Sequence, residues 1–362
     1  MTFGPWLWSA RADLAVFGGS ALLALGLVAF RHLVGFEAGL PEWAFVAFIL
    51  GIDVAHVWST LFRTYLDRNE LRARPLRYLL VPVLGYAASV SLYLAGPLVF
   101  WRVLAYLALF HFVRQAVGFA AVYRARAGRT ATLERAIDEA AVYSGTLYPV
   151  LLWHSRLEHT DFAWFVAGDF ASLPGVDLLV PVARVVYALS LVAFFAREAV
   201  TLLRRRELLL GRFVVVTSTA ATWYVGIVLT NSDFDFTVTN VIVHGVPYLA
   251  LLWAYVRAQR ERSPESLVAD VAAAGFGAFA AVVLVLAFLE ELSWDRLVWH
   301  ERGWLFGEGS AIGDGALPWL VPLLALPQLT HYVLDGFIWR RAETRRLPAQ
   351  RAALGFAVSS AE

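Results

Sequence analysis

Apolar stretches recur along the whole of this 362-residue chain, each close to the ~20 residues that an α-helix needs to cross ~30 Å of hydrocarbon. Hydrophobic residues make up 59% of the sequence and charged residues only 16%, whereas a soluble globular domain carries about 25% charged residues. We therefore predict an all-α, polytopic integral membrane protein. It is expected to form one helical bundle over residues 1–362, with short loops and no sizeable soluble domain.

The apolar stretches predict about ten transmembrane helices. Their expected limits are 14–31, 42–62, 78–97, 98–123, 136–153, 178–196, 213–230, 238–256, 268–289 and 316–339. The longest connections between them, at about 154–177 and 290–315, are expected on the outer side of the membrane. No internal repeat with a period of about 20–50 residues is visible, which argues against a repeat architecture.

Arginine residues crowd alternate connections between these helices. The arginine-rich segments are 63–77, 123–136, 197–208, 256–262 and 340–346. The other connections are poor in arginine or mixed in sign, as the positive-inside rule requires. We therefore predict a protein of a bacterial-type inner (plasma) membrane, with both termini in the cytoplasm. Orientation and contact with anionic lipids explain these arginines, so nucleic-acid binding is not indicated.

Four histidines lie singly inside four separate apolar stretches: His56, His111, His244 and His331. An ionisable group inside hydrocarbon is costly and rare, so each is by default a candidate for a functional site. In the predicted topology all four helices run from the outer face to the cytoplasm. Each histidine lies roughly 10–20 Å inside the cytoplasmic boundary, counted at ~1.5 Å per residue. The four can therefore meet in one layer, as ligands do in metal-binding and cofactor-binding bundles.

Carboxylates accompany two of these histidines. Because the chain contains no cysteine, a metal ion here needs His, Asp or Glu ligands. Asp53 precedes His56 by three residues, on the same helical face. Asp335 follows His331 by four residues, again on the same face. We predict a metal site formed by the four histidines, in which Asp53 and Asp335 either ligate the ion or fix the imidazole tautomers.

Three further polar residues lie about one helical turn from these histidines and are candidate catalytic residues. Arg114 and Gln115 follow His111 by three and four residues. Tyr248 follows His244 by four residues. Arg114 can hold an anionic substrate or a cofactor propionate, and it can equally form a structural ion pair with a carboxylate of another helix. The sequence leaves both roles open.

The remaining histidines are expected outside this site. His154 and His159 have an H-x4-H spacing that resembles the first histidine box of membrane desaturases and hydroxylases. Those families also carry adjacent histidine pairs on the cytoplasmic side, whereas this chain has none and the predicted topology places 154–159 outside. His32 and His300 lie in connections rich in Arg, Glu and Trp and are expected at the membrane interface.

These features favour an intramembrane metalloenzyme of the non-haem iron type. Imidazole and carboxylate ligands without thiolate suit iron, manganese, copper or zinc, and an open position at such a centre activates oxygen or water. A centre within the bilayer is accessible to a lipid, a fatty acyl chain or an isoprenoid. We expect desaturation, hydroxylation or oxidative cleavage of such a substrate, with an electron donor as partner. The arrangement resembles, as a fold-level analogy, bacterial membrane carotene dioxygenases and di-iron membrane hydroxylases.

A haem protein is the first alternative. The four histidines would then serve as two pairs of axial ligands. Heme A synthase is similar in placing single histidines on alternate helices, with an acid three residues before one of them, as Asp53 precedes His56 here. That family has eight helices, two fewer than the ten predicted for this chain.

A proton-coupled transporter is the second alternative. A chain of histidines and aspartates within a membrane can relay protons. Transporters often bind their substrates at interrupted helices. The prolines that could interrupt two helices here are Pro247, Pro318, Pro322 and Pro327.

Motifs for nucleotide binding and for zinc proteases are absent from the sequence.

Overall fold

The computed structural model describes residues 1–37, 39–129, 131–310, 312–339 and 348–354. Over this part of the chain the regular structure is helical, with no β-strand and one isolated bridge between Thr2 and Glu207. The prediction of an all-α protein is therefore confirmed. The last arginine-rich segment, 340–346, lies outside the described residues.

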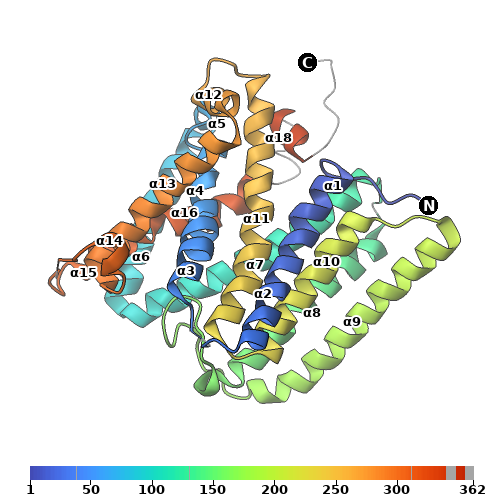
Figure 1. Cartoon of the computed structure of the whole chain (residues 1–362), viewed down its shortest axis with the longest axis horizontal. Coiled ribbons are helices and arrows are strands. Elements are labelled where there is room, and N and C mark those ends of the chain that lie inside the picture. The colour runs from blue at the N-terminus through green and yellow to red at the C-terminus, as the bar shows by residue number, and fades with distance from the viewer. Residues whose placement is uncertain (38, 130, 311, 340–347, 355–362) are drawn as a thin grey trace. The chain divides into compact units, whose positions relative to one another are not determined.

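The helices group into two compact units, which are described separately. Unit 1 contains Met1–Ala44 and Leu109–Pro247. Unit 2 contains Phe45–Ala108 and Tyr248–Ala353. Each unit also contains part of two long helices, α7 (Pro97–Arg126) and α11 (Asp233–Arg260) (Figure 1).

In unit 1, helix α8 packs against both α9 and α10 (Figure 1). The elements of this unit are α1 (Ala10–Asp13), η1 (Leu14–Gly19), α2 (Ser20–Val34), α3 (Glu42–Ala44), α8 (Thr132–His154), η4 (Leu157–His159), α9 (Val176–Arg205), α10 (Leu210–Trp223) and η5 (Tyr224–Leu229). A Cβ on Gly145 of α8 would lie 3.2 Å from the Cβ of Ala220 of α10. The lack of a side chain at Gly145 therefore permits this close approach of the two helices.

In unit 2, helix α6 packs against α15 and α16, and α13 packs against η2 and α4. The elements are η2 (Phe45–Val54), α4 (Ala55–Ser59), η3 (Thr60–Arg63), α5 (Arg68–Ala73), α6 (Pro75–Ala95), α12 (Leu267–Ala274), α13 (Phe276–Trp294), η6 (Asp295–Trp299), α14 (Gly303–Phe306), α15 (Leu317–Leu324), α16 (Leu326–Ile338) and α18 (Pro348–Ala353). Buried aromatic rings join two of these elements, since the Phe62 and Phe279 ring centroids are 5.0 Å apart.

Within the described residues, eight helical stretches are long and apolar enough to cross a membrane. They are Ala10–Val34, Glu42–Arg63, Pro75–Ala95, Pro97–Arg126, Val176–Arg205, Leu210–Leu229, Asp233–Arg260 and Phe276–Trp299. The pair α15 and α16 would make a ninth if the two helices form one bent span. The chain is thus compatible with an integral membrane protein.

The predicted count of about ten helices is not confirmed. The predicted span 136–153 falls in α8, which is helical but carries Asp138 and Glu139 in its first turns and is not among the eight. The predicted span 316–339 is divided into α15 and α16, which are bent by 46°. Pro327, in the first turn of α16, explains this break, because proline lacks the N–H and clashes with the preceding turn.

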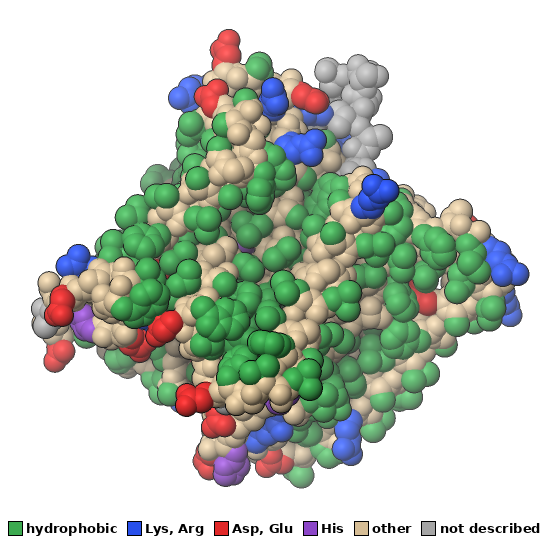
Figure 2. Space-filling view, viewed as in Figure 1, with side chains coloured by type: hydrophobic (Ala, Val, Ile, Leu, Met, Phe, Trp, Pro, Cys, Tyr) green, Lys and Arg blue, Asp and Glu red, His purple; other side chains and the backbone are tan. Residues whose placement is uncertain are grey.

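Helix α9 exposes an unusually apolar face. Leu178, Val182, Val185, Leu189 and Val192 are each more than half exposed. Figure 2 likewise shows hydrophobic side chains over much of the visible surface. Soluble monomers rarely expose contiguous apolar patches of this kind, whereas hydrocarbon solvates them well.

Candidate metal centre

His56 lies where the helical stretch Glu42–Arg63 changes its winding. The π-helix η2 carries Asp53 and gives way to the short α-helix α4, which carries His56. π-Helical turns are rare and often occur at functional sites. His56 is 1% exposed, and its Nδ1 lies 3.6 Å from Oδ1 of Asp53. This separation is too long for a hydrogen bond between the two side chains.

His56 and His331 form the first histidine pair, which lies within unit 2. Their ring centroids are 5.0 Å apart and their planes are nearly perpendicular, at 80°. The Tyr248 ring contacts both imidazoles, at 5.7 Å from His56 and 5.1 Å from His331. All three side chains are buried.

A chain of hydrogen bonds leads away from His331. Its Nδ1 lies 2.7 Å from the hydroxyl oxygen of Thr60, which lies 2.9 Å from the hydroxyl oxygen of Tyr248. The Tyr248 hydroxyl donates to Oδ1 of Asp335 at 2.5 Å. Trp339 Nε1 donates to the same carboxylate oxygen at 3.1 Å. Two hydroxyl groups therefore connect Asp335 to His331.

His111 of α7 and His244 of α11 form the second histidine pair, which lies within unit 1. Their ring centroids are 4.9 Å apart, with an angle of 79° between the planes. Phe112 stacks on His244 with ring centroids 3.6 Å apart. The side chain of Gln115 donates to the backbone carbonyl of His244 at 2.8 Å. The Phe112 ring therefore holds the face of the His244 imidazole, and Gln115 holds the His244 backbone.

The loop between α8 and α9 supports this second pair. Trp164 packs edge-on against Phe112 with ring centroids 5.0 Å apart. Asp169 folds the loop locally, since its carboxylate accepts hydrogen bonds from the backbone N–H groups of Phe165 and Val166. Burial raises the pKa of Asp169, and these backbone N–H groups act in the opposite direction. No pattern in the sequence indicated that the loop between α8 and α9 contacts a neighbour of the histidine pair.

The three predicted catalytic residues have different surroundings. Tyr248 contacts the rings of the first pair, as described above. Gln115 bonds to backbone, and the exposed Arg114 donates to the hydroxyl of Tyr143 at 2.8 Å. The geometry therefore favours a structural role for Arg114 and Gln115 and keeps Tyr248 as a functional candidate.

Four buried histidines could hold a metal ion through one ring nitrogen each: His56, His111, His244 and His331. Asp53 and Asp335 do not belong to this group, so their role as partners of ligands stays a prediction. Within the part of the chain that the structure describes, His154 and His159 do not belong to it either. His154 Nδ1 instead donates to the backbone carbonyl of Val150 at 2.7 Å. Four imidazoles without thiolate suit iron, copper, nickel or zinc.

Thr60 is one of the residues at this site that the sequence analysis did not single out. It follows His56 by four residues, so the same helical spacing that drew attention to Asp335 would have indicated it. Its hydroxyl nevertheless bonds to His331, which lies far away in the sequence. Only the packing of the helices reveals that contact.

Comparison with known proteins adds no relative from which a function could be transferred. The chain matches no protein-family model, no curated protein and no solved structure. A functional conclusion therefore depends on the chemistry of the histidines and their surroundings.

Proposed function

We propose that the protein is an integral membrane metalloprotein whose four buried histidines ligate one metal ion. The observation that carries the proposal is the burial of these histidines in two ring-to-ring pairs. Burying polar groups is costly unless they are satisfied, and a shared cation satisfies one lone pair on each imidazole. Helix α11 supports a single centre. His244 of one pair and Tyr248, which contacts both rings of the other pair, are one helical turn apart on it.

We propose non-haem iron as the metal and oxidation of an apolar substrate as the reaction. Imidazole ligands without thiolate suit iron, and a bound iron ion with an open position would activate oxygen there. Desaturation, hydroxylation or oxidative cleavage would each use this chemistry, with an electron donor as partner where the reaction requires one. The protein's own contribution is to hold the ligands and to exclude water, since every histidine of the set is buried.

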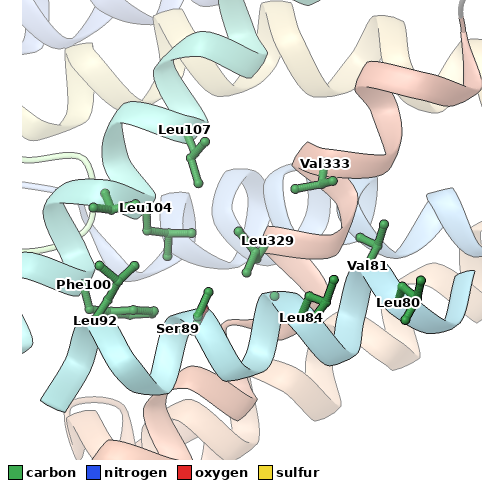
Figure 3. A pocket seen from close by; sticks show the side chains of 13 residues that line it. Leu80, Val81, Leu84, Ser89, Leu92, Phe100, Leu104, Leu107, Leu329 and Val333 are labelled. Atoms are coloured by element: carbon green, nitrogen blue, oxygen red, sulfur yellow. The ribbon is translucent and has the colours of Figure 1, made fainter. Parts of the chain in front are cut away.

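An apolar cavity in unit 2 supports a lipid-like substrate. Its volume is about 400 Å³, within the ~300–1,000 Å³ typical of small-molecule sites. Side chains of α6, α7 and α16 line it, and Figure 3 shows Leu84, Leu104, Leu107 and Leu329 around the space. Ser89 supplies the one hydroxyl group among the lining residues. Such a lining suits an acyl or isoprenoid chain and offers little to a polar ligand.

Helix α7 links this cavity to the proposed centre. Leu104 and Leu107 line the cavity and precede His111 by seven and four residues, so all three share one face of the helix. On α16, by contrast, Leu329 precedes His331 by two residues and lies on the opposite side of that helix. A chain bound in the cavity is therefore expected to reach the metal along α7.

Filling this cavity should weaken binding of a fatty acid. The variant Ser89→Phe places a ring inside the space. A displaced chain that loses on the order of ten carbon contacts of ~0.1–0.2 kcal/mol each loses roughly tenfold in affinity. Titration with a nitroxide-labelled stearic acid, followed by electron paramagnetic resonance, measures the change. Ser91→Phe is the matched control, because Ser91 is exposed on the same helix and does not line the cavity. Equal binding by both variants would contradict this placement of the substrate.

We propose that the arginine-rich segments and both termini face the cytoplasm, because these segments alternate with arginine-poor ones. The absence of cysteine makes single-cysteine labelling in intact cells clean. A cysteine at the exposed positions Arg72, Thr132 or Arg205 should stay unlabelled by a membrane-impermeant maleimide. A cysteine at Glu158 or Glu308 should be labelled. Labelling of any of the first three sites would overturn this topology.

Metal analysis of the wild-type protein tests the proposed function. Protein purified in mild detergent without chelator should contain about one iron per chain by mass spectrometry and should lack the absorption bands of haem. Haem bands would favour the paired axial histidines instead. A metal-free, colourless protein that retains its cellular function would reject both the non-haem iron hypothesis and the haem hypothesis. The proton-coupled transporter, which the break between α15 and α16 accommodates, would then be the better account.

A further inference from the structure

We infer that Thr60 is a positioning residue that holds His331 in the tautomer with its proton on Nδ1. Nε2 then carries the lone pair with which His331 binds the metal. This inference rests on the proposed metal centre and names the groups that orient one of its ligands. It is drawn wholly from contacts within unit 2.

With Asp335 as an ionised carboxylate, counting protons along the hydrogen-bond chain fixes the tautomer. The Tyr248 hydroxyl has one proton, and it donates that proton to Asp335. The 2.9 Å contact between the Tyr248 and Thr60 oxygens then requires the proton of Thr60. Thr60 has no second proton to give, so it must accept from His331 in the 2.7 Å contact with Nδ1. The proton of the imidazole therefore lies on Nδ1.

The opposite assignment leaves a contact without a proton. If Thr60 donated to His331, the oxygens of Thr60 and Tyr248 would face each other at 2.9 Å with no hydrogen between them. Such an unsatisfied contact between buried oxygens is destabilising. Asp335 sets the direction of the whole chain, because its Oδ1 accepts from both Tyr248 and Trp339.

The surroundings of Thr60 suit this role. Its side chain is buried, and the branched Cβ restricts its rotamers in a helix. Metal-binding histidines commonly donate their second ring N–H to a carboxylate or carbonyl group, and loss of that partner typically costs ~10–100-fold in metal affinity. Here two hydroxyl groups stand between the histidine and the carboxylate.

Replacing the Thr60 hydroxyl should therefore weaken metal binding. We expect Thr60→Val, which keeps the shape of the side chain, to bind Fe²⁺ ~10–100-fold more weakly than wild type in chelator competition. Thr60→Ser restores the hydroxyl and should restore the affinity. Thr64→Val is the matched control, because Thr64 is also buried, directly follows η3 and donates its hydroxyl proton to the backbone carbonyl of Thr60.

A second variant separates positioning from packing. Tyr248→Phe leaves Thr60 in place but removes its proton acceptor, so the Thr60 hydroxyl becomes able to donate to His331 and to favour the other tautomer. It should weaken Fe²⁺ binding like Thr60→Val, and the visible spectrum of Co²⁺-loaded protein should change in both. Wild-type affinity and spectrum in Thr60→Val would overturn the inference. A wild-type protein that binds neither ion would instead reject the metal centre itself.

Discussion

Replacing His56 or His331 with alanine is expected to strip the purified protein of its metal. Loss of a group that hydrogen-bonds to a metal ligand typically costs ~10–100-fold in metal affinity. Removing the ligand itself should therefore cost more than ~100-fold. Insertion into the membrane should be preserved, because it depends on apolar length and arginine bias and not on these side chains. Metal content by mass spectrometry, together with the amount of protein recovered from membranes, measures both effects.

The same experiment on the second pair tests whether the two pairs form one centre. His111→Ala and His244→Ala should each lose as much metal as the variants of the first pair. His154→Ala is the control, because this buried histidine bonds to backbone outside the group and its loss should leave the metal in place. Metal loss confined to one pair would contradict a single four-histidine centre.

Eight of the predicted spans overlap helices that are long and apolar enough to cross a membrane, because each depends on its own apolar length. Breaks within helices were harder to predict. Pro322 lies inside α15, whereas Pro327 lies in the first turn of α16 at a 46° bend. Both prolines were visible in the sequence, but surrounding contacts decide which one interrupts the helix. Polar turns in α8 similarly removed one predicted span from the candidates.

The histidines illustrate where helical spacing stops being informative. Spacing correctly indicated that Asp53 lies beside His56, because both residues belong to one helical stretch. It could not show that His56 pairs with His331 across sequence-distant helices. Nor could it show that Asp335 bonds to Tyr248, because that choice depends on a neighbouring helix that supplies the hydroxyl.

Two arginines of the arginine-rich segments, and Arg212 outside them, bond to carboxylates within unit 1. Arg124 of α7 and Arg197 of α9 both bond to Asp138 of α8, at 2.8 and 2.7 Å. Arg212 of α10 is fully buried and bonds to Glu198 of α9. Arginine-rich composition predicts orientation, but it does not reveal which guanidinium groups find buried carboxylates. These five side chains join four helices.

Asp138→Asn is expected to destabilise unit 1 strongly. The substitution keeps the size of the side chain but removes one of two carboxylates that face three arginines. Arg124 would lose its charged partner, and Arg197 and Arg212 would be left with Glu198 alone. Removing one partner of a buried ion pair typically costs ~3–5 kcal/mol, because the remaining charge stays buried without compensation. Thermal and denaturant unfolding of the protein in detergent measures the loss.

Glu139→Gln supplies the matched control on the adjacent residue of the same helix. Glu139 pairs with Arg135 at 2.8 Å, but the Arg135 side chain is 64% exposed, so water screens the interaction. A surface pair of this kind contributes less than ~1 kcal/mol, and the variant should unfold almost as the wild type does. If Asp138→Asn and Glu139→Gln lowered stability equally, the buried carboxylate could not be what holds the four helices together. A large loss confined to Asp138→Asn would show that these arginines contribute to the fold of unit 1.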